Sequence, residues 1–309
     1  MASADRFRVG RTPEGGVSIG FSAIATYLNC NELLRWTYIE GGDGIEPQAP
    51  ESKDALWYGK LWHGLYQGRV MGQSDADVWA ALVPAEVALS YGLSEMTADM
   101  DWYFDQVRSM RVNIVACEVE MAVPVGVHVL RGTPDLVAEV EADWGGGTYI
   151  IDHKTYVAVS YDKRGYMRLN TRPPDAAYTR NKHSRQFPFY TGLVERALGR
   201  KVDGCLVNFV PQRVNWALAQ AAERGKSFTP AVVRDFIFPN DDTVAETWDD
   251  ALRAAGQIAA MPPEGPWAHN NKACITQWGG TCAFIDLCEA KRADRPALIA
   301  AMYQPRVIV

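Results

Sequence analysis

The stretch TYIIDHKTY, residues 148–156, constrains the fold of this chain most strongly. It is apolar enough to form a buried strand, yet it contains Asp152 and Lys154, whose side chains point to the same face because alternate residues of a strand do. Burying an unpaired carboxylate or ammonium is costly, and a strand with a purely structural role would carry Val or Thr at these positions. The two charges therefore indicate a functional site on this strand.

The sequence before this strand predicts a meander of three consecutive antiparallel strands. Residues 113–125 and 127–140 are rich in β-forming side chains, and the turn signal DWGGG precedes residues 148–156. With the turn centred in that loop, Asp135 and Asp152 lie across from each other. Cross-strand neighbours on one face have Cβ atoms about 4.5–5.5 Å apart, so the two carboxylates are expected to be adjacent.

Two adjacent carboxylates repel each other unless a cation lies between them, and such oxygen ligands select a hard divalent ion, Mg²⁺ or Mn²⁺. We expect Asp135 and Asp152 to hold this ion, and Lys154 to orient or deprotonate a water and to stabilise charge on a phosphate. The alternative is a surface hairpin with an ordinary Asp–Lys pair. Glu118 and Glu120, on the neighbouring strand, are expected to face solvent more often than to support the ion.

The rest of the chain predicts helices around these strands. Residues 17–41 are expected to form one helix, capped by Ser22 and ended by Gly41 and Gly42, and residues 52–110 form a helical region. The later elements expected are a helix at 186–198, a strand at 204–212, a helix at 242–260 and an irregular tail with cysteines. This order predicts a single α/β domain over residues 1–309, with a helical part (1–111), a core (112–240) and a C-terminal part (241–309).

Composition argues against a membrane span and leaves nucleic acid as a partner. No apolar run approaches the roughly 20 residues of a span, and the first residues lack the apolar core of a signal peptide, so the cytoplasm is expected. The net charge is −6, but residues 162–185 hold seven Lys/Arg against two Asp. With Tyr161, Tyr166 and Tyr178 interleaved, this basic segment could face phosphates and stack on bases, or be a solvated loop without a partner.

Six cysteines are read as reduced thiols in that compartment. Cys117 and Cys205 lie in predicted strands and fit small buried residues. Cys274, Cys282 and Cys288 lie in the irregular tail, which lacks the apolar content to fold unaided. A bound metal would explain how this tail is held, and thiolates suit zinc as well as iron–sulfur.

The motifs together resemble a known family. GTPDLV followed by IIDHKT is similar to the G-x-x-D and D/E-x-K elements of the PD-(D/E)XK nuclease superfamily, and is most similar to its RecB-type branch. In that branch Gln186 and Tyr190 match a Q-x-x-x-Y helix motif, and His63 matches an upstream histidine that adds a nitrogen ligand. Cys30 with the three tail cysteines resembles the split four-cysteine set of AddB-type and CRISPR-associated members.

The resemblance implies a restriction-endonuclease-like core, a mixed sheet flanked by helices. It implies metal ligands from His63, Asp135, Asp152 and the carbonyl of His153, with Lys154 as the catalytic base or water-orienting group. Gln186 and Tyr190 would position Lys154 or the DNA backbone. Four residues would hold a [4Fe-4S] cluster: Cys30, Cys274, Cys282 and Cys288.

The function implied is a Mg²⁺- or Mn²⁺-dependent DNA exonuclease, acting on single strands or DNA ends, encoded by a bacterium or a phage. No Walker motif is present, so a helicase or recombination protein would be a separate chain. Two alternatives stay open. One is a DNA-binding or recombination-partner protein that keeps the fold and cluster but cleaves poorly, and the other is a zinc-stapled hydrolase of another substrate.

Overall fold

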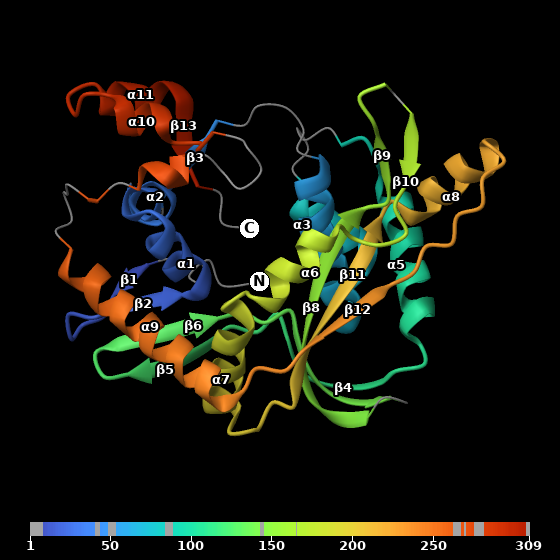
Figure 1. Ribbon diagram of the computed structural model, residues 1–309, viewed down its shortest axis with the longest axis horizontal. Coiled ribbons are helices and arrows are strands. Elements are labelled where there is room, and N and C mark those ends of the chain that lie inside the picture. Colours follow the sequence, from blue (N-terminus) through green and yellow to red (C-terminus); the bar gives the residue numbers. More distant parts are fainter. Residues whose placement is uncertain are drawn as a thin grey trace.

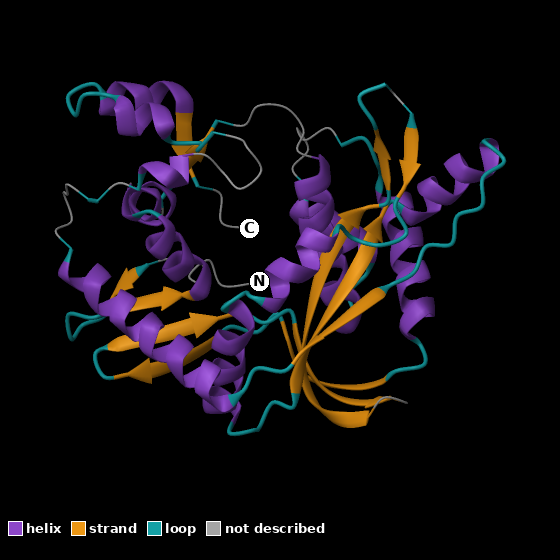
Figure 2. Ribbon diagram, in the orientation of Figure 1, coloured by secondary structure: helices purple, strands orange, loops and turns teal. Residues whose placement is uncertain are grey.

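The computed structural model describes residues 9–40, 44–48, 54–83, 89–142, 145–164, 166–261, 267–268, 270–274 and 281–306. A five-stranded sheet and a four-stranded sheet lie side by side with helices around them (Figures 1 and 2). This arrangement confirms the predicted mixed α/β fold. None of the helices in the described ranges combines the length and apolar character needed to cross a bilayer.

The five-stranded sheet carries the strand from which the sequence analysis began. Its order is β12-β11-β8-β7-β4. The strands are β4 (Arg111–Cys117), β7 (Leu136–Ala142), β8 (Gly145–Val157), β11 (Gly204–Gln212) and β12 (Val233–Ile237). Strand β8 is antiparallel to β7 and parallel to β11. The parallel pair requires a crossover, and the helices α6 (Asp175–Lys182) and α7 (Gln186–Leu198) supply it.

The predicted three-strand meander is wrong in one respect, because each of its first two strands is divided. Residues 113–125 break after Cys117, and residues 127–140 break after Gly132. The pieces β5 (Met121–Val125) and β6 (His128–Gly132) join β1 (Gly10–Arg11) and β2 (Val17–Gly20) in the four-stranded sheet, of order β1-β2-β6-β5. At the first break Glu118 has a φ of 50°, a left-handed conformation that ends a strand.

The predicted single helix over residues 17–41 is also wrong. Val17 and Ile19 are fully buried and alternate with partly exposed residues, so this part is strand β2. Helix α1 (Phe21–Asn29) begins after Gly20, which takes the N-cap position in place of Ser22. Cys30 has extended backbone and separates α1 from α2 (Asn31–Leu34) and the π-helical turn Arg35–Ile39. Gly41 and Gly42 lie outside the described residues.

The predicted helical region lies on one face of the five-stranded sheet. It consists of α3 (Asp54–Val70), α4 (Asp75–Leu82) and α5 (Leu93–Val107). Trp62 of α3 and Met100 of α5 are fully buried in one core with Ile151 of β8. A second core covers the opposite face, where Ile150 packs with residues of α1, α7 and α9 (Asp241–Ala260). The middle of strand β8 is therefore buried on both faces, which explains the consecutive apolar residues Tyr149, Ile150 and Ile151.

The remaining described elements lie outside the two main sheets. They are β9 (Val159–Tyr161), β10 (Met167–Leu169), α8 (Val214–Glu223), α10 (Ile285–Glu289), α11 (Arg295–Met302), a 3₁₀ turn (Asn271–Cys274) and β13 (Tyr303–Pro305), which pairs with β3 (Ile45–Pro47). Trp36, Phe284, Leu287 and Tyr303 form a small core between the first and last parts of the chain. The C-terminal segment is thus anchored to the region around α2.

Candidate active site and cysteine site

The predicted register of the central hairpin is confirmed. In the β7–β8 pair, Leu136 lies opposite Ile151, so the same register continued by one residue sets Asp135 against Asp152. The backbone N–H of His153 donates a 2.8 Å hydrogen bond to Oδ2 of Asp135. This bond fixes the carboxylate of Asp135 at the edge of β8, although Asp135 itself precedes strand β7.

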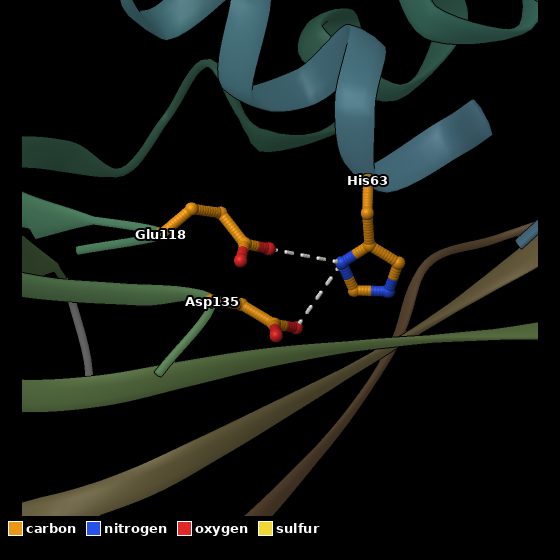
Figure 3. A group of neighbouring side chains, drawn as sticks. All are labelled: His63, Glu118 and Asp135. Carbon is orange, nitrogen blue, oxygen red and sulfur yellow. Dashed lines mark ion pairs between the residues drawn. The ribbon is translucent and has the colours of Figure 1, made fainter. Parts of the chain in front are cut away.

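The imidazole of His63 lies between this carboxylate and that of Glu118. Nδ1 of His63, on α3, lies 3.4 Å from Oδ2 of Asp135 and 3.6 Å from Oε1 of Glu118 (Figure 3). Within the described chain these are the three residues whose ligand atoms all lie within 4.8 Å of one another. One imidazole nitrogen and two carboxylate oxygens are donors that suit Mn²⁺ or Mg²⁺. The trio therefore fits a divalent ion.

The surroundings of His63 favour a positive charge on its imidazole. Burial alone would lower the pKa of His63, but Asp135 and Glu118 outweigh that effect and raise the pKa to about 9. An imidazolium between two carboxylates compensates their mutual repulsion. A metal ion would replace this proton, since a ligand nitrogen must be deprotonated.

Asp152 lies close enough to Asp135 and His63 for their charges to act on its carboxylate, and it pairs with Lys154. Nζ of Lys154 lies 3.0 Å from Oδ1 and 2.9 Å from Oδ2 of Asp152, and Nε2 of Gln186 donates to Oδ1 at 3.3 Å. Burial raises the pKa of Asp152 to about 6, with Lys154 opposing and Asp135 reinforcing the shift. Burial would lower the pKa of Lys154, but the two aspartates raise it above its ordinary value. Lys154 is therefore an ammonium at neutral pH.

Gln186 and Tyr190 come from the first turns of α7, as the i, i+4 spacing predicts. The helix begins at Gln186, so Pro188 lies in its first turn, where no backbone donor is lost. Tyr190 lies beside Asp135 and Asp152 and forms a hydrogen bond with Gln186; burial raises the pKa of its hydroxyl. Gly132 allows this packing, because a Cβ there would lie 2.8 Å from the Tyr190 ring.

His153 contributes its backbone to the site and its side chain to the core. The imidazole is fully buried among Trp62, Tyr66 and Tyr103, and its Nε2 lies 2.8 Å from the Tyr103 hydroxyl. Burial lowers the pKa of this imidazole, so it is neutral. The side chain thus points to the face opposite Asp152 and Lys154, as expected.

A cavity of about 1000 Å³ opens onto these residues. Its walls come from the start of α1, from α3 and α4, and from the site, including His63, Glu118, Asp135, Lys154 and Tyr190. Glu118 was expected to face solvent, but it lines this cavity and joins His63. The alternating pattern of Glu118 and Glu120 in the sequence does not indicate the left-handed conformation of Glu118 that directs its side chain into the cavity. Glu120 instead pairs with Arg131 at 3.5 Å.

The four cysteines singled out by the sequence lie together although they are far apart in the chain. Cys30, Cys274, Cys282 and Cys288 line one small cavity with Leu33, Trp36 and Phe284. The N–H of Cys282 donates to the carbonyl of Cys274 at 2.8 Å. Burial raises the pKa of Cys288 to about 11. Among the described residues no three of these sulfurs lie within 4.8 Å of one another, so the thiols surround the pocket without converging on one point, while Cys117 and Cys205 are buried in the sheet cores.

Asp135, just before strand β7, and Asp152 and Lys154, on strand β8, form the acid, acid, lysine set that the sequence predicted. This chain belongs to the PD-(D/E)XK nuclease superfamily, whose sequence model matches residues 18–289. Among solved structures, one from Eubacterium rectale described as "Putative exonuclease" is 10% identical, with a TM-score of 0.42 over 93% of this chain and 95% of that chain. No curated protein matches the chain.

Proposed function

We propose that this protein is a metal-dependent DNA exonuclease of the RecB type. The observation that supports the proposal best is the trio of His63, Glu118 and Asp135 directly beside the Asp152–Lys154 pair. The trio suits a divalent cation, and the pair places a fixed ammonium next to it. A phosphodiester carries negative charge that repels an attacking water. The cation and the Lys154 ammonium would both lower this barrier to attack by offsetting the negative charge.

His63, Asp135, Asp152 and the carbonyl of His153 would hold Mg²⁺ or Mn²⁺, with Glu118 as an additional ligand or as a partner of a bound water. The bound ion would polarise the phosphoryl oxygen and lower the pKa of the attacking water. Because the pKa of Lys154 is raised, we assign to Lys154 the orientation of that water and the stabilisation of charge on the phosphate. Deprotonation of the water by Lys154 is the less suitable role.

Gln186 and Tyr190 would keep this arrangement in place. The amide of Gln186 donates to the same Asp152 oxygen that Lys154 contacts, so it orients that carboxylate. The ring of Tyr190 borders the cavity next to Asp135. Both residues are therefore proposed as positioning residues for Lys154 or for the DNA backbone.

Single-stranded DNA or a DNA end is the proposed substrate. Residues of α1, α3 and α4 form walls of the cavity around the site. A cavity with such walls accommodates a single DNA strand better than an intact duplex. The basic segment 162–185 follows β8 directly, and the charge of Arg180 acts on the ammonium of Lys154. We propose that this segment guides the strand, and that any helicase or recombination partner is a separate chain.

We further propose a [4Fe-4S] cluster at Cys30, Cys274, Cys282 and Cys288. The support is the shared cavity of four thiols and the resemblance to the iron–sulfur branch of the superfamily. Such a cluster would link α2 to the C-terminal segment. The described parts of residues 1–309 would then act as one nuclease domain, since α1, α7 and α9 already share a core against β8. Zinc is the alternative occupant.

The test of function is a cleavage assay on labelled linear and circular single-stranded DNA with Mn²⁺ or EDTA. An exonuclease shortens the linear strand, spares the circle and stops in EDTA, and Asp152→Ala should be inactive. Binding of both DNAs without cleavage would instead support the DNA-binding or recombination-partner function.

The same assay tests the assignment of Glu118. We expect Glu118→Gln to raise the Mn²⁺ concentration needed for half-maximal cleavage about 10- to 100-fold, as loss of a supporting carboxylate does in metal sites. Glu120→Gln is the matched control, because Glu120 pairs with Arg131 and does not contact His63. Equal Mn²⁺ requirements for the two variants would remove Glu118 from the metal site.

A further inference from the structure

The hairpin β9–β10 exposes two aromatic side chains beyond the end of the catalytic strand. Tyr161 is 53% and Tyr166 is 67% exposed. In Figure 1 this hairpin projects from the end of β8, beside α8. Single exposed hydrophobic residues are common, but here two rings lie at one hairpin tip beside Lys163 and Arg164, which are also exposed.

The base of the hairpin is firmly attached to β8 and α8. Val159 and Met167 are buried with Ala217 of α8. The N–H of Asn170 donates to the carbonyl of Ala158 at 2.8 Å, and its side-chain amide donates to the carbonyl of Val157 at 2.9 Å. The tip is therefore held at a fixed place relative to the strand that carries Asp152 and Lys154.

The tip itself is shaped by Asp162. Its Oδ1 accepts from the N–H of Arg164 at 2.9 Å and from the N–H of Tyr166 at 3.0 Å, and its own N–H donates to the Tyr166 carbonyl at 3.0 Å. The Asp162 carboxylate orders the turn through these hydrogen bonds. Lys163 and Arg164 are exposed in this turn, between the two tyrosines in the sequence.

We propose that this tip, formed by Tyr161, Lys163, Arg164 and Tyr166, is a binding site for unpaired nucleotides of the substrate strand, outside the catalytic cavity. The proposal rests on DNA being the substrate, as proposed above. Aromatic faces stack on bases of any sequence, and the adjacent cations contact phosphates. Tyr178 is not part of this site, because its ring packs on Phe209 with centroids 5.0 Å apart.

The distance along the chain allows one strand to reach both places. Tyr161 follows Lys154 by seven positions, and seven extended steps of about 3.3 Å span at most about 23 Å. A stacked strand rises about 3.4 Å per nucleotide, so about seven nucleotides or fewer bridge the two sites. A single-stranded end of moderate length could thus occupy the hairpin and the cavity together.

The experiment compares the binding of a labelled 20-nucleotide single strand, by fluorescence anisotropy without divalent ions, among variants of the full chain. We expect Tyr161→Ala with Tyr166→Ala to weaken binding at least about tenfold, since each stacked base contributes severalfold. Tyr161→Phe with Tyr166→Phe keeps both aromatic faces and should bind within about twofold of wild type. Phe238→Ala is the control, because Phe238 is 64% exposed but lies against Gly204, at the opposite end of the sheet.

The salt dependence of the DNA-binding affinity separates the contribution of base stacking from that of phosphate contacts. Lys163→Ala with Arg164→Ala should reduce the slope of log affinity against log salt by about 1.4, two phosphate contacts at about 0.7 each. The double tyrosine-to-alanine variant should keep the wild-type slope. All variants are checked for an unchanged melting temperature.

The outcomes distinguish this proposal from the proposed function. If the wild type cleaves DNA but the double alanine variant binds the strand as tightly as wild type, the hairpin site is overturned, and the exposed tyrosines serve another partner such as a protein. If the wild type neither binds nor cleaves DNA, the proposed function fails and this site fails with it. Weakened binding by the alanine pair, with rescue by the phenylalanine pair, supports the proposal.

Discussion

Lys154→Ala is expected to lower the rate of DNA cleavage about 100- to 1000-fold, the usual effect of removing one electrostatic group from an active site. Lys154 is an ammonium held within 3.0 Å of both Asp152 oxygens, near the trio proposed to bind the cation. Its loss removes a positive charge next to the phosphate and leaves Asp152 with Gln186 as its remaining partner. The measurement is single-turnover cleavage of labelled single-stranded DNA at saturating Mn²⁺.

Lys201, which lies outside the site, provides a control for the loss of one positive charge. Lys201 is exposed and pairs with Asp241 at 3.6 Å, so Lys201→Ala changes the net charge equally. We expect Lys201→Ala to cleave at the wild-type rate. A wild-type rate in the folded Lys154→Ala variant would show that Lys154 takes no part in the reaction. Circular dichroism verifies that both variants are folded.

The second large effect is expected at the cysteine site. If the proposed cluster is present, Cys282→Ala should lose the iron and the brown colour that the cluster would give, because Cys282 lines the cavity with the other three thiols. Residues 281–306 are held by a small core around Phe284 and Leu287, so a bound cluster would supply much of their stability. Iron analysis, the visible spectrum and limited proteolysis of this segment provide the measurements.

The matched control is Cys117→Ala, since Cys117 is buried in another core and lies away from the four-thiol cavity. This variant should retain its iron. Iron-free wild-type protein containing zinc would contradict the cluster and favour the zinc alternative, because zinc has a filled d shell and its thiolate sites are colourless. Unchanged iron in Cys282→Ala would exclude this residue as a ligand.

The sequence predicted the parts of the site that depend on local spacing. The register that sets Asp135 against Asp152 follows from the turn position, and the common face of Gln186 and Tyr190 follows from helix geometry. Strand β8 and helix α7 were predictable for the same reason. Helix α7 buries one face in a single core, and the middle of strand β8 is buried between two cores.

The missed features depend on contacts that are distant in sequence. Glu118 reaches His63 because the chain leaves one sheet there and enters the other. No residue pattern predicts a left-handed conformation at a glutamate. Likewise, Val17 and Ile19 form a strand because β6 lies beside them, which overrides the helical pattern that follows. Tyr178 could not be separated from Tyr161 and Tyr166 without knowing that Phe209 covers it.

The most direct test of the metal site is a crystal structure of the protein soaked in Mn²⁺, with the ion located by anomalous scattering. We predict a single peak at the trio, about 2.1 Å from a carboxylate oxygen of Asp135 and from Nδ1 of His63, with Asp152 or Glu118 completing the protein ligands. The contrary result is no peak, with His63 still paired to Asp135 and Glu118. A chain that gave this result at saturating Mn²⁺ would not be the metal-dependent nuclease proposed.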